Sequence, residues 1–375
     1  MIFPGPSVED TARDSGSGSA RGATPVTVGL VAGGALAAVL VAVVGVSLAG
    51  RGTGELRIPG AGATTVLRAA VFAALAVHLG ELAGTRLART GPARTGAART
   101  GPARTGAART GPARTGPART GPARTGAART GPVTIPVPAP APGAPEPRRL
   151  AVTASLVGAA ASAGQILLLA RVSGLDLATV YGTSDGRFLL VMANGFLLAA
   201  GCATLTRPAL ALAPLAAVVG AEALRAHPEP YTPMLGVALT VVHLTAASLW
   251  TGGLLYVLRA MWLRRGDPAG SRDLLGRYAR HAARLLAALA ATGTLSTLRR
   301  LPADVVLTSA YGRVLMAKLV LVAVVCALAL TARVRLRRGG DAGRPARAEL
   351  AFLALVVLVS AVLTVVPDPH WLSTR

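Results

Sequence analysis

Long apolar blocks, separated by short polar or arginine-rich segments, dominate the pattern of this chain. Each block is rich in Ala, Val and Leu on all sides rather than along one helical stripe, and most are long enough to cross a hydrocarbon core of roughly 30 Å. The pattern predicts an all-α fold, a polytopic membrane helix bundle with about nine transmembrane helices. The predicted spans cover residues 26–49, 64–83, 150–170, 188–205, 209–224, 234–258, 279–298, 313–332 and 348–366.

The segments between the spans suggest how the chain is organised. Residues 87–132 repeat a pentad, Gly-Pro-Ala-Arg-Thr or Gly-Ala-Ala-Arg-Thr, and hold no large apolar residue after Leu87, so this stretch cannot bury a core. We therefore expect five parts. They are a disordered N-terminus (1–25), two transmembrane helices with the first retained (26–84), a disordered cytoplasmic repeat loop (85–149), a seven-helix bundle (150–366) and an outer tail (367–375).

Charge changes this picture in only one respect, which is orientation. The net charge is +23, but only 15% of the residues are charged, and most arginines lie between apolar blocks instead of forming a basic face. This excludes a nucleic-acid-binding class and indicates membrane topology. The loops at 259–280 and 333–347 and the repeat loop all favour the cytoplasm. We expect a multi-pass plasma membrane protein with a cytoplasmic N-terminus and an extracytoplasmic C-terminus.

Polar side chains inside spans are costly and are the first candidates for function. His243 lies about 13 Å into its span, near the midplane. Imidazole and thioether groups together suit Cu(I), so the sequence suggests a copper route. The candidate copper ligands are His243, His227, Met234, Met192 and Met316, with Asn194, Glu222 and Lys318 nearby at the outer side.

Structural roles for the same residues stay open at this stage. A single Met in an apolar helix is usually packing, a single intramembrane His often bonds to another helix, and Lys318 can extend to the interface. His78 and Glu81 share a helix face, as a bonded pair or as a cytoplasmic-side metal or proton step. No nucleophile–base pair or nucleotide-binding loop occurs, and His78 and His243 differ in depth, which disfavours a haem site. We therefore predict that the protein is not an enzyme.

Several segments in order resemble the copper resistance protein D family, CopD. The run from His243 to Trp250-Thr-Gly252-Gly253 resembles that family's His followed by Trp-x-Gly-Gly on one helix. Arg277-Tyr278-Ala-Arg280, Tyr311-Gly312-Arg313 with Lys318, and Glu349-Leu near the start of the last helix also resemble family segments. The resemblance covers about residues 227–367.

The resemblance implies copper resistance or copper ion transport across the plasma membrane, with His227 and His243 as copper candidates. His227 departs from the family's usual Gly-His-Ala, since this chain has Ala226-His227-Pro228. The expected partners are copper ion, the lipid bilayer and an extracytoplasmic copper-binding protein. The alternative is a non-transporting membrane assembly or sensing subunit that acts with such a copper-binding partner.

The predicted topology can be tested with single cysteines in a background that lacks Cys202 and Cys326. We expect Ala269→Cys to resist an impermeant thiol reagent in intact cells, because its arginine-rich loop is predicted to be cytoplasmic. Thr232→Cys should react. The reverse labelling pattern would overturn the orientation.

Overall fold

The computed structural model describes residues 44–45, 47–51, 59–89, 150–205, 207–226, 232–264, 267–301 and 303–367. These residues are almost all helical and include no strand, so the predicted all-α bundle is confirmed. Most of the first predicted span, the repeat loop, His227 and the tail beyond Pro367 lie outside the described residues.

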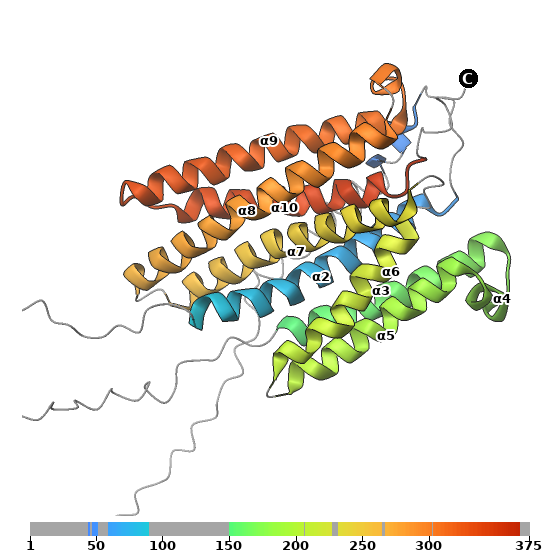
Figure 1. Ribbon diagram of the computed structural model, residues 1–375, viewed down its shortest axis with the longest axis horizontal. Helices are drawn as coiled ribbons and strands as arrows, with labels where there is room; N and C mark the ends of the chain where they lie inside the picture. Colours follow the sequence, from blue (N-terminus) through green and yellow to red (C-terminus); the bar gives the residue numbers. More distant parts are fainter. Residues whose placement is uncertain are drawn as a thin grey trace, which may run out of the picture.

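The helices follow one another with short connections (Figure 1). Proline stands in the first turn of both α7 and α8, where its missing N–H costs nothing. The elements are α2 (Ala61–Arg89), α3 (Leu150–Ser173), α4 (Leu177–Gly182), α5 (Ser184–Thr204), η1 (Pro208–Ala211), α6 (Leu212–Ala226), α7 (Pro233–Leu263), α8 (Pro268–Arg300), η2 (Ala303–Val305), α9 (Ala310–Arg337) and α10 (Gly343–Leu363).

Seven helices of the described part are long and apolar enough to cross a membrane, with η1 and α6 counted as one. Helix α8 is not among the seven, because Arg280, Arg284 and several threonines lower its hydropathy. It is nevertheless 33 residues long and packs along α7, which is one of the seven. With most of the first predicted span outside the described residues, the total of nine stays a prediction.

Helix α2 occupies the middle of the bundle and packs against α3, α7 and α10 (Figure 1). On one side, α2 to α6 enclose an apolar core around Leu75, Phe196 and Leu215. On the other side, α7 to α10 enclose a second core around Trp250, Leu254 and Val325. The bundle therefore has two halves, and α2 and α7 form the seam between them.

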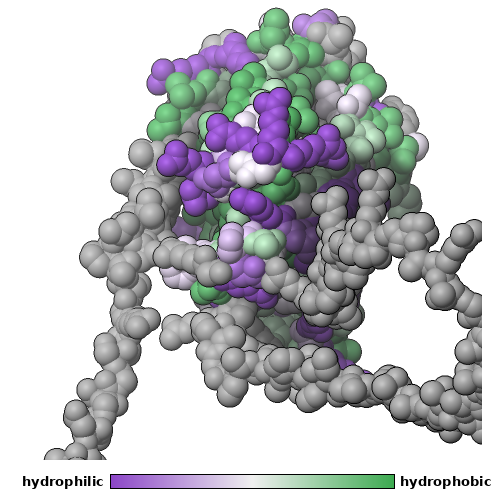
Figure 2. All heavy atoms as spheres, turned by 90° about the vertical axis from the view of Figure 1, so that its left-hand side faces the viewer, coloured by the Kyte–Doolittle hydropathy of each residue, from purple (hydrophilic) through white to green (hydrophobic). Residues whose placement is uncertain are grey.

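Arginines gather at one end of the bundle, which we call the arginine-rich end. Here α2, α7 and α9 finish while α8 and α10 begin, so the loops at 259–280 and 333–347 share one end, as the sequence predicts (Figure 1). Figure 2 looks onto this end, where hydrophilic residues cluster between apolar helices. Its arginines include Arg86, Arg89, Arg259, Arg264, Arg272, Arg277, Arg280, Arg333, Arg335, Arg337, Arg338, Arg344 and Arg347.

The seam between α2 and α7 depends on glycines. Gly80 of α2 lies directly against the backbone of Gly252 of α7, and Gly252 lies against the carbonyl of Ala76. One turn further, Gly84 packs against the ring of Tyr256. Helices of a membrane bundle have no hydrophobic drive to associate, so close backbone approach of this kind supplies the attraction through dispersion.

The packing at the seam predicts that substitution by alanine has very different effects on stability at two glycines. We expect Gly252→Ala to lower the free energy of unfolding by about 2 kcal/mol or more, since its Cβ would overlap the Ala76 carbonyl. Gly201→Ala of α5 is the control, because nothing lies within 4 Å of its Cβ and alanine favours the helix. Thermal unfolding of both purified variants in detergent would measure this, and equal melting temperatures would contradict it.

Candidate functional site

His243 faces the next helix of the bundle rather than the seam. It lies on α7, half-buried, with its Nδ1 2.9 Å from Oγ1 of Thr292 on α8. The ring also lies beside Gly293, where a Cβ would come within 3.5 Å of the imidazole Cε1. A small residue on α8 thus makes room for the imidazole.

The hydrogen bonds of Thr292 determine which nitrogen of His243 carries the proton. Oγ1 of Thr292 lies 2.7 Å from the carbonyl of Ala288, one turn earlier, and a carbonyl can only accept. The hydroxyl proton therefore points to Ala288, and Oγ1 accepts a proton from Nδ1–H of His243. The lone pair of the imidazole is left on Nε2, which is the arrangement that a metal-binding histidine requires.

A cation also acts on this imidazole. Lys318, on α9 and half-buried, lies close enough for its charge to act on His243. The surroundings of His243 therefore combine α7, α8 and α9. A positive charge at this place opposes the retention of a second cation, because like charges repel strongly where water is scarce.

The structure does not gather the methionines of the sequence-based copper set around His243. Met192 is fully buried in the apolar core with Phe196, whereas Met234 is 76% exposed and Met316 is 40% exposed. Asn194 donates to the carbonyl of Leu190 on its own helix. Among the described residues, no group of three or more His, Cys, Asp or Glu is placed to hold a metal ion.

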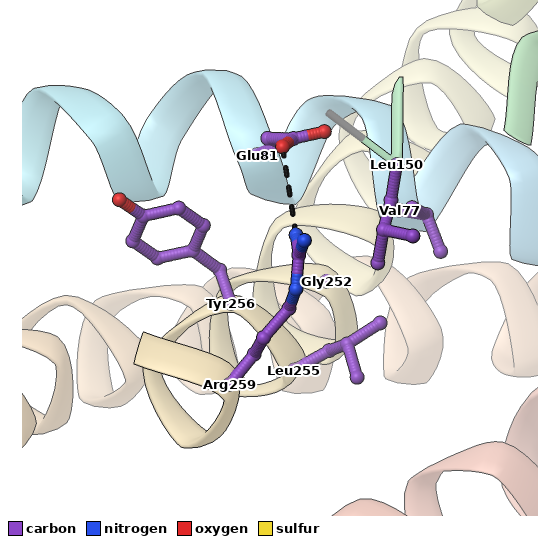
Figure 3. Close-up of a pocket in the computed structure, with 7 residues that line it drawn as sticks. All are labelled: Val77, Glu81, Leu150, Gly252, Leu255, Tyr256 and Arg259. Carbon is purple, nitrogen blue, oxygen red and sulfur yellow. Dashed lines mark ion pairs between the residues drawn. The ribbon is translucent and has the colours of Figure 1, made fainter. Parts of the chain in front are cut away.

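His78 and Glu81 lie in the half of α2 that leads to the arginine-rich end, and their side chains have different partners. Nδ1 of His78 lies 2.6 Å from Oγ of Ser155, and its Nε2 is buried without a hydrogen bond. Glu81 accepts from the backbone N–H of Ala151 at 2.6 Å and pairs with Arg259 at 3.7 Å. Figure 3 shows Glu81 and Arg259 at a narrow pocket between α2, α7 and the start of α3.

Three segments that carry the family resemblance meet at one buried joint. The indole N–H of Trp250 donates to Oε1 of Glu349 at 3.2 Å, and the hydroxyl of Tyr278 donates to the carbonyl of Trp250 at 2.7 Å. Gly253 leaves room for the ring of Tyr278. The joint fastens α7, α8 and α10 together two turns from His243, so the residue spacing of the family segments has a structural reason.

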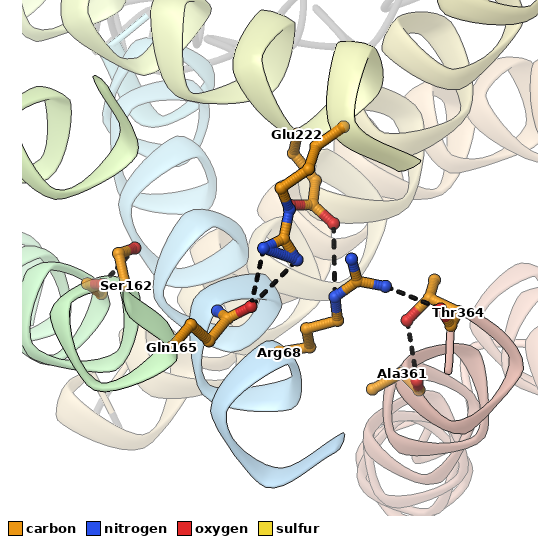
Figure 4. Close-up of polar contacts among 8 residues, drawn as sticks. Arg68, Ser162, Gln165, Glu222, Ala361 and Thr364 are labelled. Atoms are coloured by element: carbon orange, nitrogen blue, oxygen red, sulfur yellow. Dashed lines mark hydrogen bonds and ion pairs between the residues drawn. The ribbon is translucent and has the colours of Figure 1, made fainter. Parts of the chain in front are cut away.

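A second polar cluster lies at the end opposite the arginines, and sequence reasoning found only part of it. Glu222 of α6 pairs with Arg225 at 3.4 Å and with Arg68 of α2 at 4.0 Å, and all three side chains are buried (Figure 4). Arg225 also donates to the side-chain carbonyl of Gln165, and Arg68 donates to the carbonyl of Thr364. Arg68 was missed, although an arginine inside an apolar block is itself the signal.

The arrangement of this cluster predicts that the stability of the protein depends strongly on Glu222, the acid of the cluster. We expect Glu222→Ala to destabilise the protein by about 3–5 kcal/mol, because two buried guanidinium groups would lose their shared carboxylate. Asp273→Ala is the control and should cost less than about 1 kcal/mol, since the Asp273 side chain is 57% exposed and water screens its ion pair with Arg277. Thermal unfolding in detergent measures both. Equal effects would show that the Glu222 cluster is no more than a surface pair.

The comparison with known families gives one match. The family model of copper resistance protein D, CopD, matches residues 272–366, which run from the start of α8 to just beyond α10. No curated protein and no solved structure matches the chain. Tyr278, Lys318 and Glu349 lie inside the matched region, while His243 and Trp250 precede it. Over these three helices the chain is similar to the copper resistance protein D family, which is consistent with a copper-related membrane protein.

Proposed function

We propose that this protein transports copper ions across the plasma membrane and that His243 binds the ion inside the bundle. The family match supports a role in copper resistance. The observation that carries the proposal is the orientation of His243, whose Nδ1–H is held by Thr292 so that the lone pair of Nε2 is free. Imidazole is a good ligand for both oxidation states of copper.

The surroundings of His243 favour passage over storage. A carrier must bind its ion tightly enough to admit it and weakly enough to release it. A single imidazole with the charge of Lys318 acting on it meets the second requirement, because the ammonium group repels a bound cation. Copper is the substrate here, and its ligands are exchanged as it moves.

The other members of the copper set take different places in this proposal. Met234 and Met316 are exposed and lie in the half of the bundle away from the arginine-rich end, where thioethers can receive or pass on Cu(I). His227 precedes α7 by a few residues, and we keep it as an entry ligand on the strength of the family resemblance alone. Met192 is enclosed by apolar side chains, so the proposal assigns it to packing.

A second candidate function is a subunit that assembles with a copper-binding partner outside the membrane. The observation that favours it is Met234, whose side chain is 76% exposed at the first turn of α7. A thioether at a helix end can complete a metal site on another protein. Copper uptake by vesicles that contain the purified protein alone separates the two functions, since a subunit of this kind would give no uptake without its partner.

The proposal predicts that His243→Ala abolishes copper-dependent uptake or tolerance while the protein stays folded in the membrane. Folding should survive, because hydrogen bonds between membrane helices average only about 0.6 kcal/mol. His281→Ala is the matched control, since that histidine is exposed and its Nδ1 lies 2.9 Å from a carbonyl of its own helix. Cellular copper content at equal membrane abundance is the measurement. Wild-type copper handling by His243→Ala would end the proposal.

Thr292 supplies a finer test of the same idea. Thr292→Val keeps the shape of the side chain but removes the acceptor for Nδ1–H, and loss of such a supporting hydrogen bond weakens metal binding about 10- to 100-fold. Thr292→Ser keeps the hydroxyl and should restore most of the affinity. A competition titration with a chromophoric Cu(I) chelator would measure both variants. Equal Cu(I) affinities would show that the hydrogen bond does not orient a ligand.

A further inference from the structure

A basic cavity lies between α8 and α9 at the arginine-rich end. Its volume is about 270 Å³, which is far more than a single water molecule requires. Helix α8 packs mainly against α7, so its contact with α9 is sparse and the cavity opens between them. The lining residues are Gly276, Ala279 and Arg280 of α8, and Arg333, Leu336 and Arg337 of α9.

Within the described ranges, no acid pairs with the three arginines of this cavity. None of their guanidinium groups makes a hydrogen bond or ion pair with another residue of the described ranges. The acids at this end are used elsewhere. Asp273 pairs with Arg277 at 3.0 Å, Asp341 accepts from the backbone N–H of Gly343, and Asp267 caps α8 through Gly270.

The rest of the cavity lining is apolar, and an apolar surface continues from it along α9. Gly276, Ala279 and Leu336 make up the apolar part of the lining. Along α9, toward the middle of the bundle, Val334 and Leu330 continue as an exposed apolar surface. Figure 2 shows hydrophilic side chains of this end directly beside hydrophobic ones. A fitting ligand therefore has an anionic head and an apolar body.

We propose that this cavity binds the phosphate of an anionic phospholipid, with the acyl chains along the apolar face of α9. Guanidinium groups bind phosphate oxygens through paired, charge-assisted hydrogen bonds, and basic pockets between membrane helices suit anionic headgroups. The lipid phosphate bridges α8 and α9, two of the three helices that surround His243. This site is separate from His243 and does not depend on copper transport.

The test uses the full chain, purified and delipidated in detergent, and phosphatidylglycerol or phosphatidylcholine with the same acyl chains. Native mass spectrometry counts the lipids that stay bound. We expect retained phosphatidylglycerol and little phosphatidylcholine. The triple variant R280Q, R333Q, R337Q should bind phosphatidylglycerol about ten-fold more weakly or worse, because each arginine near a headgroup contributes about 1 kcal/mol.

The matched control is the triple variant R272Q, R335Q, R344Q, which removes equal charge from the same end without touching the cavity. It should keep its affinity for phosphatidylglycerol. Equal losses in both triple variants would mean that diffuse surface charge holds the lipid, and the cavity proposal would fail.

Two further measurements test whether the cavity itself binds the lipid. Ala279→Phe fills the cavity while leaving all three arginines, and we expect the same ten-fold loss of phosphatidylglycerol. This variant decides the matter even if the triple variant does not fold. Inorganic phosphate in excess is the last arm. If the delipidated protein binds inorganic phosphate but retains no phosphatidylglycerol, the cavity is a site for free phosphate and the lipid assignment is wrong.

Discussion

The backbone contact between Gly80 and Gly252 is the constraint on which the two halves of the bundle depend. Both positions lie at the seam of α2 and α7, and a side chain at either one would overlap the opposite backbone. In a bilayer, lipid tails are as apolar as leucine, so contact area and close packing hold helices together. This backbone contact fixes the distance between the halves and also the rotation of α7 about its axis.

That rotation determines what the rest of α7 faces. With Gly252 against α2, the neighbouring Gly253 faces the ring of Tyr278 on α8, and Trp250 reaches Glu349 on α10. Two turns along the same helix, His243 meets Thr292 of α8. The segments around Trp250, Tyr278 and Glu349 are thus parts of one joint, which holds α7, α8 and α10 in register near the proposed copper ligand.

Charge is distributed in opposite ways at the two ends of the bundle. At one end, Arg68 and Arg225 are buried and share the carboxylate of Glu222, which ties α2 to α6 while Arg68 also reaches α10. At the arginine-rich end, Arg280, Arg333 and Arg337 surround a cavity without an acid among its lining residues. A buried cation needs a partner within the protein, whereas a cation at the level of lipid headgroups can take its partner from the bilayer.

The sequence by itself determined the all-α membrane bundle, the common end of the arginine-rich loops and the CopD resemblance, since long apolar blocks, arginine positions and local motifs are all features of nearby residues. In the sequence, His243 is a single polar residue in an apolar span. Only the tertiary structure shows that Thr292 and Lys318 lie near it. Tertiary structure also decided that Met192 lies in the core while Met234 is exposed, and that Arg68 pairs with Glu222.

The physical reason is that helices rich in Ala, Val and Leu on every side have no apolar stripe to show which face turns inward. The rotation of each helix is then fixed by contacts between residues far apart in the chain, such as Gly80 with Gly252.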